Sequence, residues 1–475
     1  MSTTSQASQR INALLDENSF VEIGGLVTAR ATDFNLKQTE TPSDGVVTGY
    51  GVIDGSLVYV YSQDASVLNG SVGEMHAKKI VNLYDLAMKM GAPVIGLIDS
   101  AGLRLQEATD ALNGFGEIYR SQVMASGVIP QITAVFGNCG GGLALIPAMT
   151  DFAFMEEKKA KLFVNSPNAL EGNEISRCDT SAAAFQSEET GLVDMVADEA
   201  SILAQIRQLV SILPANNADY ALTDCTDDLN RACAQIAGCV GDTAIALSQI
   251  ADDGLFVEVK QDYAKDMVAG FIRLNGATVG AVANRTEVYD ADGEVTDKFD
   301  AVLSARGAEK AAEFVTFCDA FDIPVLSLTN VTGFAATKCS EKRMAKAVGR
   351  LTYAFANATV PKVNVVIGKA YGSAYVAMNS KAIGADITMA WPDAEIGMMD
   401  AKLAAKIICD GQGADAIDAC AQEYAALQNN VTSAAKRGYV DQIVEPADTR
   451  KYVIGAFEML AAKSEGRPEK KHGTV

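Results

Sequence analysis

Stretches of this chain recur at a nearly constant spacing. Residues 92–102 and residues 128–142 each resemble a stretch that lies 231 positions later. Residues 47–55 resemble a stretch that lies 221 positions later, which indicates that the second copy has gained ten residues after its first match. Three matches in the same order predict that the chain is a duplicated domain.

Each copy has the same predicted layout. A pair of strands turns at Asp54-Gly55 or at Asn275-Gly276, and both dipeptides are strong hairpin signals. Apolar strands that alternate with helices are typical of parallel sheets covered on both faces, so the fold class is α/β. The domains are predicted as residues 1–235 and 236–475. The helices are predicted at residues 79–90 and 310–321, and the buried strands at 93–98, 132–136, 324–328 and 363–367.

Composition excludes several kinds of protein. The 475 residues carry a net charge of −21, which repels phosphate backbones and argues against a nucleic-acid partner. The chain has two histidines, and His76 is internal whereas His472 lies in a polar tail. One internal histidine is too few for the usual catalytic zinc sites, which have two or three histidine ligands. We therefore predict no metal. The uncharged stretch 121–150 contains prolines and a glycine run, which favour a strand, a turn and a helix over a membrane span.

Cysteine usage and the N-terminus indicate the compartment. The nine cysteines are scattered and form no C-x-x-C motif, which fits a reducing compartment. The first eight residues lack the charged and apolar pattern of an export signal. We therefore expect a cytoplasmic protein.

Glycine turns lie at matching places in the two copies, at residues 137–142 and 368–374, where a strand runs into a helix. Glycine permits a positive φ there and lets a ligand approach the backbone. The first-turn N–H groups of the helix can bind a phosphate or an oxyanion. Tight packing of strand against helix would also explain glycine in one copy, but its recurrence in both favours a functional role.

Other residues leave alternatives open. Arg104, in the loop after the first buried strand, either binds a phosphate or carboxylate of a ligand or forms an ordinary surface salt bridge. His76 fits a capping or core role better than a catalytic one. The stretch Ala87-Met-Lys-Met90 matches the biotin-attachment tetrapeptide, yet it lies on a predicted helix instead of a hairpin tip, so we do not expect biotin on Lys89.

The chain resembles the carboxyltransferase subunits of biotin-dependent acyl-CoA carboxylases and of sodium-pumping acyl-CoA decarboxylases, of the propionyl-CoA carboxylase and methylmalonyl-CoA decarboxylase type. The likeness runs from Arg10 to the region of Ile407. The stretches that carry it are residues 44–51, 62–64, 73–76, 125–130, 317–321, 358–362, 369–372 and 390–396.

This resemblance implies a crotonase-type fold with two β-β-α superhelix domains, an acyl-CoA thioester bound to the first and biotin approaching the second. It implies an oxyanion hole from the amides of Gly141 and Gly142 for the acyl carbonyl, and one from Ser373 and Ala374 for the biotin ureido oxygen. The expected substrate-binding residues are Ala101, Gly102, Leu103, Arg104, Gly140, Tyr371, Gly372 and Val376.

The resemblance also implies partners. These are a separate biotin carboxyl carrier protein, a biotin carboxylase or a sodium-pump membrane subunit, and further copies of the chain in a hexamer or another dimer-based oligomer whose active sites form between subunits. A sodium-pump complex would place the protein at a membrane.

The sequence departs from the family pattern at four places: the bulkier loop Ala101-Gly-Leu-Arg104, the loop 331–337 that lacks two prolines, Val376 where the family often has aspartate, and the shorter segment 165–190. They keep two other functions open. One is a crotonase-fold scaffold with altered substrate or no turnover. The other is a biotin-independent hydratase or isomerase, with Glu107 or Glu117 as its base.

Overall fold

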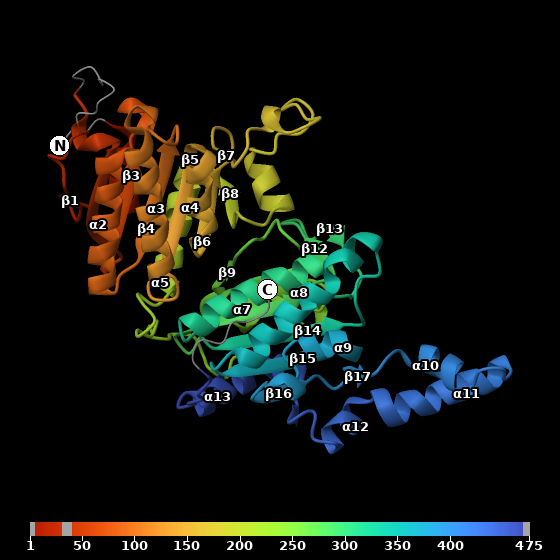
Figure 1. The fold of residues 1–475 in the computed structure, drawn as a ribbon. Coiled ribbons are helices and arrows are strands. Elements are labelled where there is room, and N and C mark those ends of the chain that lie inside the picture. Colours follow the sequence, from red (N-terminus) through yellow and green to blue (C-terminus); the bar gives the residue numbers. More distant parts are fainter. Residues whose placement is uncertain (1–4, 31–39, 469–475) are drawn as a thin grey trace. The chain divides into compact units, whose positions relative to one another are not determined.

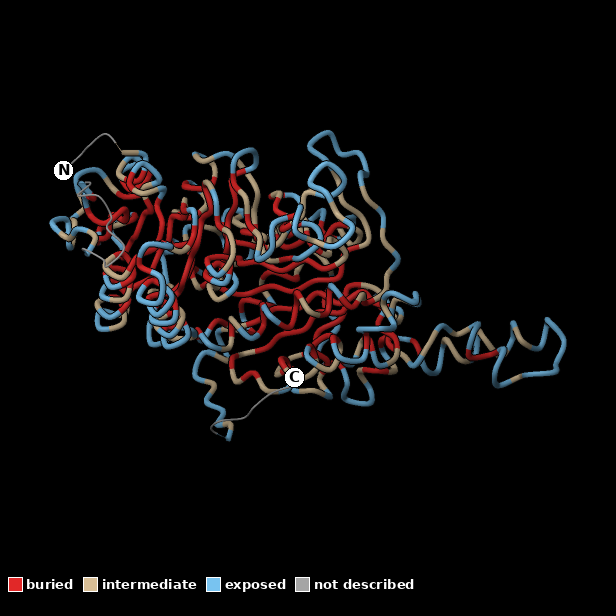
Figure 2. Tube along the Cα trace, turned by 45° about the horizontal axis from the view of Figure 1, so that its top comes forward, coloured by how far each residue is buried: buried red, intermediate tan, exposed pale blue. Residues whose placement is uncertain are grey.

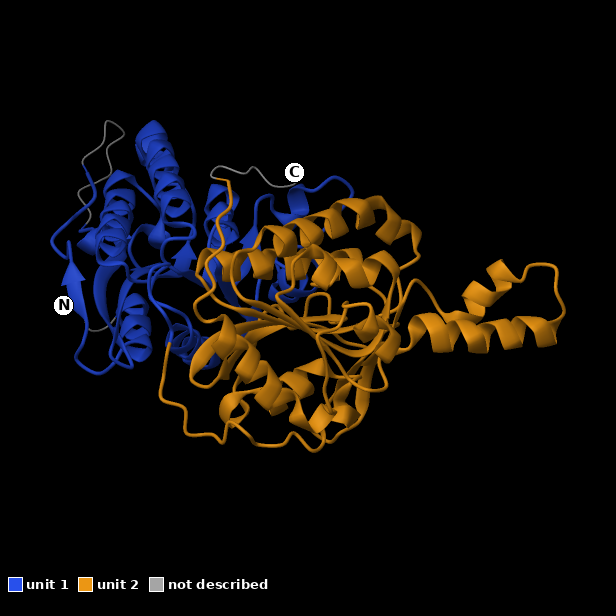
Figure 3. Cartoon of the chain, turned by 90° about the horizontal axis from the view of Figure 1, so that it is seen from below, with its two compact units in different colours: residues 1–221 blue, residues 222–475 orange. Residues whose placement is uncertain are grey.

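The computed structural model describes residues 5–30 and 40–468. Two compact units divide the chain, residues 1–221 and 222–475 (Figure 3). The boundary between the units falls between Ala221 and Leu222, whereas the sequence analysis places it after residue 235. The assignment of acyl-CoA to the first half and biotin to the second stays a prediction. His472 and the first four residues of the predicted signal-free N-terminus lie outside the described residues.

Unit 1 contains a mixed eight-stranded sheet (Figure 1). Its strands lie side by side in the order β1-β2-β3-β4-β5-β6-β8, and β7 pairs with β5. β1 to β3 are antiparallel, and the later strands are parallel. The strands are β1 Val21–Ile23, β2 Val46–Ile53, β3 Ser56–Gln63, β4 Val94–Ser100, β5 Gln131–Gly140, β6 Phe152–Glu156, β7 Lys161–Phe163 and β8 Met195–Ala197. The helices are α1 Gln6–Leu14, α2 Glu74–Met90, α3 Ala108–Ala125, α4 Leu145–Ala148 and α5 Glu199–Ile212.

Unit 2 repeats this sheet with the order β9-β10-β11-β14-β15-β16-β18, and β17 pairs with β15. Its strands are β9 Phe256–Glu258, β10 Met267–Leu274, β11 Ala277–Asn284, β14 Val325–Val331, β15 Lys362–Tyr371, β16 Ile387–Ala390, β17 Glu395–Gly397 and β18 Gln442–Ile443, with a separate hairpin β12 Glu287–Tyr289 and β13 Val295–Lys298. Its helices are α6 Thr243–Ile250, α7 Ala305–Ala320, α8 Lys338–Asn357, α9 Gly372–Ala377, α10 Ala401–Ile408, α11 Ala414–Tyr424, α12 Val431–Lys436 and α13 Thr449–Leu460.

The registers of the two sheets agree at the offsets found in the sequence. Tyr59 pairs with Val94 in unit 1, and Gly280 pairs with Val325 in unit 2. The β4–β5 and β14–β15 pairs also carry a register shift at the same place, before Ser100 and Val331. The α/β class and the duplication predicted from the sequence are therefore confirmed.

The ten-residue insertion lies between β11 and α7. Twenty residues separate Asn284 from Ala305, whereas ten separate Gln63 from Glu74, and the β12–β13 hairpin occupies the longer connection. The insertion therefore leaves the sheet unchanged and only increases the sequence distance between equivalent residues of the two copies.

Helices cover both faces of each sheet, and this explains why the parallel strands read as continuous apolar runs. In unit 1, α2 packs against α3 and α1 packs against α5. The central strands β4 and β5 are buried along almost their whole length (Figure 2). Residues 121–150 form the end of α3, then β5, a glycine turn and α4, as predicted. Within the described residues, no helix has both the length and the apolarity that crossing a membrane requires.

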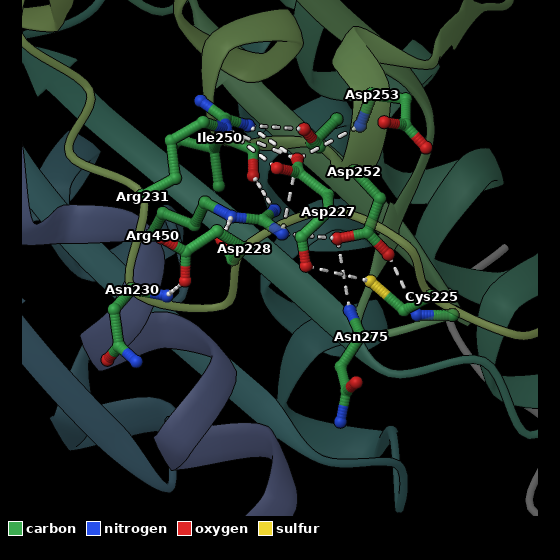
Figure 4. Close-up of polar contacts among 12 residues, drawn as sticks. Cys225, Asp227, Asp228, Asn230, Arg231, Ile250, Asp252, Asp253, Asn275 and Arg450 are labelled. Carbon is green, nitrogen blue, oxygen red and sulfur yellow. Dashed lines mark hydrogen bonds and ion pairs between the residues drawn. The ribbon is translucent and has the colours of Figure 1, made fainter.

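A buried arginine connects three segments of unit 2 (Figure 4). Arg450, on α13, is fully buried and donates to Asp252 Oδ1 at 2.7 Å, while its Nη2 lies 3.3 Å from Asp227 Oδ2. Asp252 accepts the N–H of Gly276 at 2.7 Å, in the predicted hairpin turn. One cation thus connects the C-terminal helix, the entry segment of unit 2 and its first hairpin.

We expect Arg450→Met to destabilise unit 2 by about 3–5 kcal/mol, because the substitution leaves Asp252 buried without its cation. Urea unfolding followed by circular dichroism measures the loss. The neighbouring Lys451→Met removes an exposed cation and should change the free energy of unfolding by less than about 1 kcal/mol. Equal effects of the two substitutions would contradict the role given to Arg450.

Candidate active site

The glycine turn of unit 1 follows the carboxyl end of β5. The strand ends at Gly140, and a short 3-10 helix, Gly141–Ala144, leads into α4. Gly141 has a φ of 64°, a conformation that L-amino acids rarely adopt, and a Cβ built on it would meet nothing within 4 Å. The backbone at Gly141 is therefore bare toward open space, and the first-turn N–H groups have no partner inside the helix.

A cavity of about 630 Å³ adjoins this turn. It is lined by Ala101, Gly102, Leu103, Leu112, Phe115, Gly116, Tyr119, Gly140, Gly141, Gly142 and Phe163. None of these side chains is ionisable at neutral pH. The Tyr119 hydroxyl donates its proton to the carbonyl of Gly142. Backbone amides are thus the polar donors that the lining residues can offer to a ligand.

Aromatic rings surround the glycine run. A Cβ on Gly140 would lie 2.7 Å from the ring of Phe163, and a Cβ on Gly142 would lie 2.9 Å from Tyr119 Oη and 3.4 Å from the ring of Phe115. These contacts exclude larger side chains at both glycines unless the rings move. Glycine in the turn therefore has a steric reason as well as a conformational one.

Unit 2 repeats the turn. β15 ends at Tyr371, and α9 begins at Gly372, whose φ of 61° matches that of Gly141, 231 positions earlier. The same offset aligns Gly142 with Ser373. Strict equivalence therefore pairs Gly141 and Gly142 with Gly372 and Ser373, one residue before the predicted pair of Ser373 and Ala374.

The remaining predicted residues of unit 2 lie around this turn. Tyr371 is buried, and its hydroxyl donates a hydrogen bond to the carboxylate of Glu395. Burial raises the pKa of this phenol. Ala374 is also buried, whereas Ser373 and Val376 are exposed. The altered loop 331–337 is tied down at both ends, by Thr332 N–H to a carbonyl in the preceding segment at 2.7 Å and by Thr337, which caps α8.

Arg104 is fully buried, and this differs from both alternatives that the sequence left open. Its guanidinium donates to Asp44 Oδ1 and Glu107 Oε1, each at 2.7 Å, and to the carbonyl of Ser71 at 2.7 Å. Burial raises the pKa of Asp44, although the charge of Arg104 opposes that effect. The guanidinium is neither in the cavity lining nor in a surface ion pair. It holds the loop that carries Ala101 to Leu103 into the cavity wall.

Neither carboxylate proposed as a general base lines the cavity. Glu107 is buried against Arg104 and accepts the N–H of Glu74 at 2.5 Å. Glu117 accepts a hydrogen bond from the exposed Asn113 on α3 at 3.2 Å. The described geometry therefore gives no support to a hydratase or isomerase that uses them.

His76 is a core residue, as its preferred interpretation from the sequence predicts. Its Nδ1 lies 3.0 Å from the Asp44 carbonyl and its Nε2 lies 3.2 Å from Gln63 Nε2. Because a carbonyl only accepts, Nδ1 carries the proton and Nε2 accepts from Gln63. Burial lowers the pKa of His76 to about 3, so the imidazole is neutral in the folded protein. Lys89 lies in the last turn of α2, a helix, as predicted.

Six predicted residues line the cavity: Ala101, Gly102, Leu103, Gly140, Gly141 and Gly142. The sequence analysis missed the apolar wall from α3 and β7, which is Leu112, Phe115, Gly116, Tyr119 and Phe163. Their spacing along residues 112–119 is that of one helix face, a pattern that predicts packing but does not distinguish a core face from a cavity wall.

We expect the stability of the wild-type protein to fall more steeply with acid than that of His76→Gln. The unfolded chain binds a proton at this histidine below about pH 6.5, and the folded protein does not until about pH 3. The unfolded state thus binds more protons in this window, and stability falls as the pH falls. The slopes, measured by urea unfolding from pH 7 to pH 4.5, should differ by up to about 1.4 kcal/mol per pH unit. Parallel slopes would show that His76 is charged in the fold.

Comparison with known proteins identifies the family. Residues 4–475 match the family model of the carboxyl transferase domain. The chain is 38% identical to the methylmalonyl-CoA decarboxylase subunit alpha of Propionigenium modestum, over 99% of this chain and 92% of that protein. It is 41% identical to the propionyl-CoA carboxylase beta chain of Roseobacter denitrificans, over 99% and 93% of the two chains.

A solved structure agrees with these relatives. The crystal structure of transcarboxylase 12S, described as a hexamer assembly with methylmalonyl-coenzyme A and methylmalonic acid bound, is 37% identical and has a TM-score of 0.92 over 98% of this chain and 92% of that chain. The expected duplicated fold of this enzyme class is thereby confirmed. The chain belongs to the carboxyl transferase family.

Proposed function

We propose that the protein moves a carboxyl group between biotin, borne by a separate carrier protein, and the α-carbon of an acyl-CoA such as methylmalonyl-CoA or propionyl-CoA. The substrate class follows the names of the relatives, a methylmalonyl-CoA decarboxylase subunit and a propionyl-CoA carboxylase chain. Carboxylation and decarboxylation share this half-reaction, so the same site serves both directions.

One observation supports the unit 1 cavity as the thioester site: its lining residues carry no ionised side chain, yet it contains a bare glycine turn. When the α-carbon of the thioester gains or loses a carboxyl group, negative charge develops on the thioester oxygen. Preorganised amides of Gly141 and Gly142 can stabilise this charge, with each important donor contributing roughly 3–4 kcal/mol. An uncharged, largely apolar wall strengthens such hydrogen bonds.

The turn of unit 2 fits biotin in the same way. A carrier must deliver its group from solution, and Ser373 and Val376 are exposed there. The Gly372 turn offers amides of Ser373 and Ala374 to a neutral, planar carbonyl oxygen, with Tyr371 and Gly372 beside them. When bound, biotin supplies the nitrogen that carries the carboxyl group. The residues of this chain hold its oxygen and keep the turn open.

Oligomerisation and partners complete the proposal. The neighbouring transcarboxylase structure is described as a hexamer. We expect a homo-oligomer in which the first domain of one subunit meets the second domain of another. We also expect a biotin carboxyl carrier protein and either a biotin carboxylase or a sodium-pump membrane subunit as partners. The location would be the cytoplasm, at the membrane face where a sodium pump is the partner.

Two substitutions test the proposal. Gly142→Val forces a Cβ against Tyr119 Oη, and Ala374→Pro removes one amide donor in the first turn of α9, where proline is tolerated. We expect each to lower biotin-dependent decarboxylation of methylmalonyl-CoA by at least about 100-fold while oligomer assembly survives. A panel of malonyl-, methylmalonyl- and glutaconyl-CoA identifies the acyl group.

Ala414→Pro is the matched control, because it places proline at the first position of the exposed helix α11 and removes an amide that we assign no role. Its activity should equal that of the wild type. If Gly142→Val or Ala374→Pro retains wild-type exchange with an intact oligomer, the amides do not perform the proposed chemistry.

A further inference from the structure

The run of three glycines in unit 1 needs support from outside. Glycine loses more conformational freedom on folding than any other residue, and three in succession have no side chains to hold them. β7 supports the first of them, because Gly140 pairs with Phe163 in the sheet. Gly141 and Gly142 lie beyond the strand and must be held by other contacts.

Tyr119 supplies such a contact from α3. Its Oη donates a hydrogen bond to the carbonyl of Gly142 at 2.5 Å. The N–H of Leu145 donates to the same carbonyl within the short helix. The ring of Tyr119 stacks on that of Phe115, with centroids 5.9 Å apart and an angle of 16° between the planes. Burial raises the pKa of the phenol, so it is protonated and able to donate at neutral pH.

This bond acts on the direction in which the N–H groups of the glycine turn point. Along a helix the carbonyls point toward one end and the N–H groups toward the other. The Gly142 carbonyl shares its peptide plane with the Leu143 N–H, and it is joined to the Gly142 N–H through the φ and ψ of Gly142. Holding this carbonyl in the helical direction therefore limits the rotation that would turn the Gly142 N–H away from the end whose glycines line the cavity. Without the Tyr119 bond, the Gly142 carbonyl keeps the N–H of Leu145 as its partner, and glycine has no side chain that limits its rotation.

The hydroxyl is not repeated at the equivalent position of unit 2. The position 231 residues after Tyr119 is Arg350, and the turn of unit 2 begins beside Lys369, whose N–H is held at 3.0 Å by Asn330 Oδ1. The Tyr119 bond is therefore not part of the duplicated backbone plan. It depends on a residue that only unit 1 has at this position.

We propose that Tyr119 is a positioning residue that fixes the Gly141–Gly142 amides through its hydrogen bond to the Gly142 carbonyl. This inference rests on the proposed function, because the amides that Tyr119 positions are the ones proposed to stabilise the thioester oxygen. The hydroxyl itself acts on the backbone, and it need not touch the reacting atoms.

Tyr119→Phe removes the hydroxyl and retains the ring. We expect kcat for biotin-dependent decarboxylation of methylmalonyl-CoA to fall about tenfold with KM changed less than about twofold, because the lost contact acts on the charge that develops in the transition state. Thermal unfolding should remain near that of the wild type. Tyr220→Phe, at an exposed tyrosine of unit 1, is the matched control and should leave kcat unchanged.

A second variant keeps the test independent of folding. A Cβ at position 142 lies 2.9 Å from Tyr119 Oη, so Gly142→Ala displaces the hydroxyl and breaks the same hydrogen bond. We expect Gly142→Ala to reduce kcat about tenfold in the wild type and less than about threefold in the Tyr119→Phe background, since the bond can be lost only once.

The outcomes separate the two proposals. A wild-type protein that fails to decarboxylate any acyl-CoA of the panel would end the proposed function. A working wild type with unchanged kcat in Tyr119→Phe, or with fully additive losses in the double variant, would overturn the role of Tyr119 and leave the proposed function standing.

Discussion

The structure depends on one backbone constraint: a glycine with positive φ directly after the carboxyl end of a parallel strand, in both copies. Gly141 and Gly372 have φ values of 64° and 61°. At this position the chain reverses from strand to helix with bare amides, and a side chain would strain the backbone. The sheets, their covering helices and the buried charged side chains determine where these two turns lie and what surrounds them.

The two units share a backbone plan but are held by different side chains. Lys79 and its equivalent Lys310, 231 positions later, both donate to backbone carbonyls of the segment before them, and burial lowers the pKa of each to about 8. The cluster of Asp44, Arg104 and Glu107 has no such counterpart, because the equivalent residues of unit 2 are Lys265, Ala335 and Lys338. Unit 2 instead has the buried Arg450. Duplication preserved the turn, whereas the buried arginines differ: Arg104 holds the loop beside the turn of unit 1, and Arg450 holds the first hairpin of unit 2.

Periodicity and self-similarity in the sequence were enough to predict the class, the succession of strands and helices along each copy and the ten-residue insertion. These features depend on the local pattern and on a repeat that one chain can reveal. The glycine turn was likewise visible, because glycine has few other reasons to recur at one offset. Arg104 could not be placed, since its partner Asp44 lies 60 residues away and only the fold brings them together. The wall of Leu112, Phe115 and Tyr119 on α3 was missed because an apolar helix face has the same pattern whether it meets a core or a cavity.

The most direct test of the central claim, that backbone amides stabilise the thioester oxygen, is a crystal structure of the protein with a stable acyl-CoA analogue whose thioester sulfur is replaced. The account predicts the analogue's acyl group in the cavity of unit 1, with its carbonyl oxygen about 2.7–3.1 Å from the amide nitrogens of Gly141 and Gly142. An acyl group bound in that cavity with its carbonyl oxygen turned away from both amides, or bound elsewhere, would contradict it.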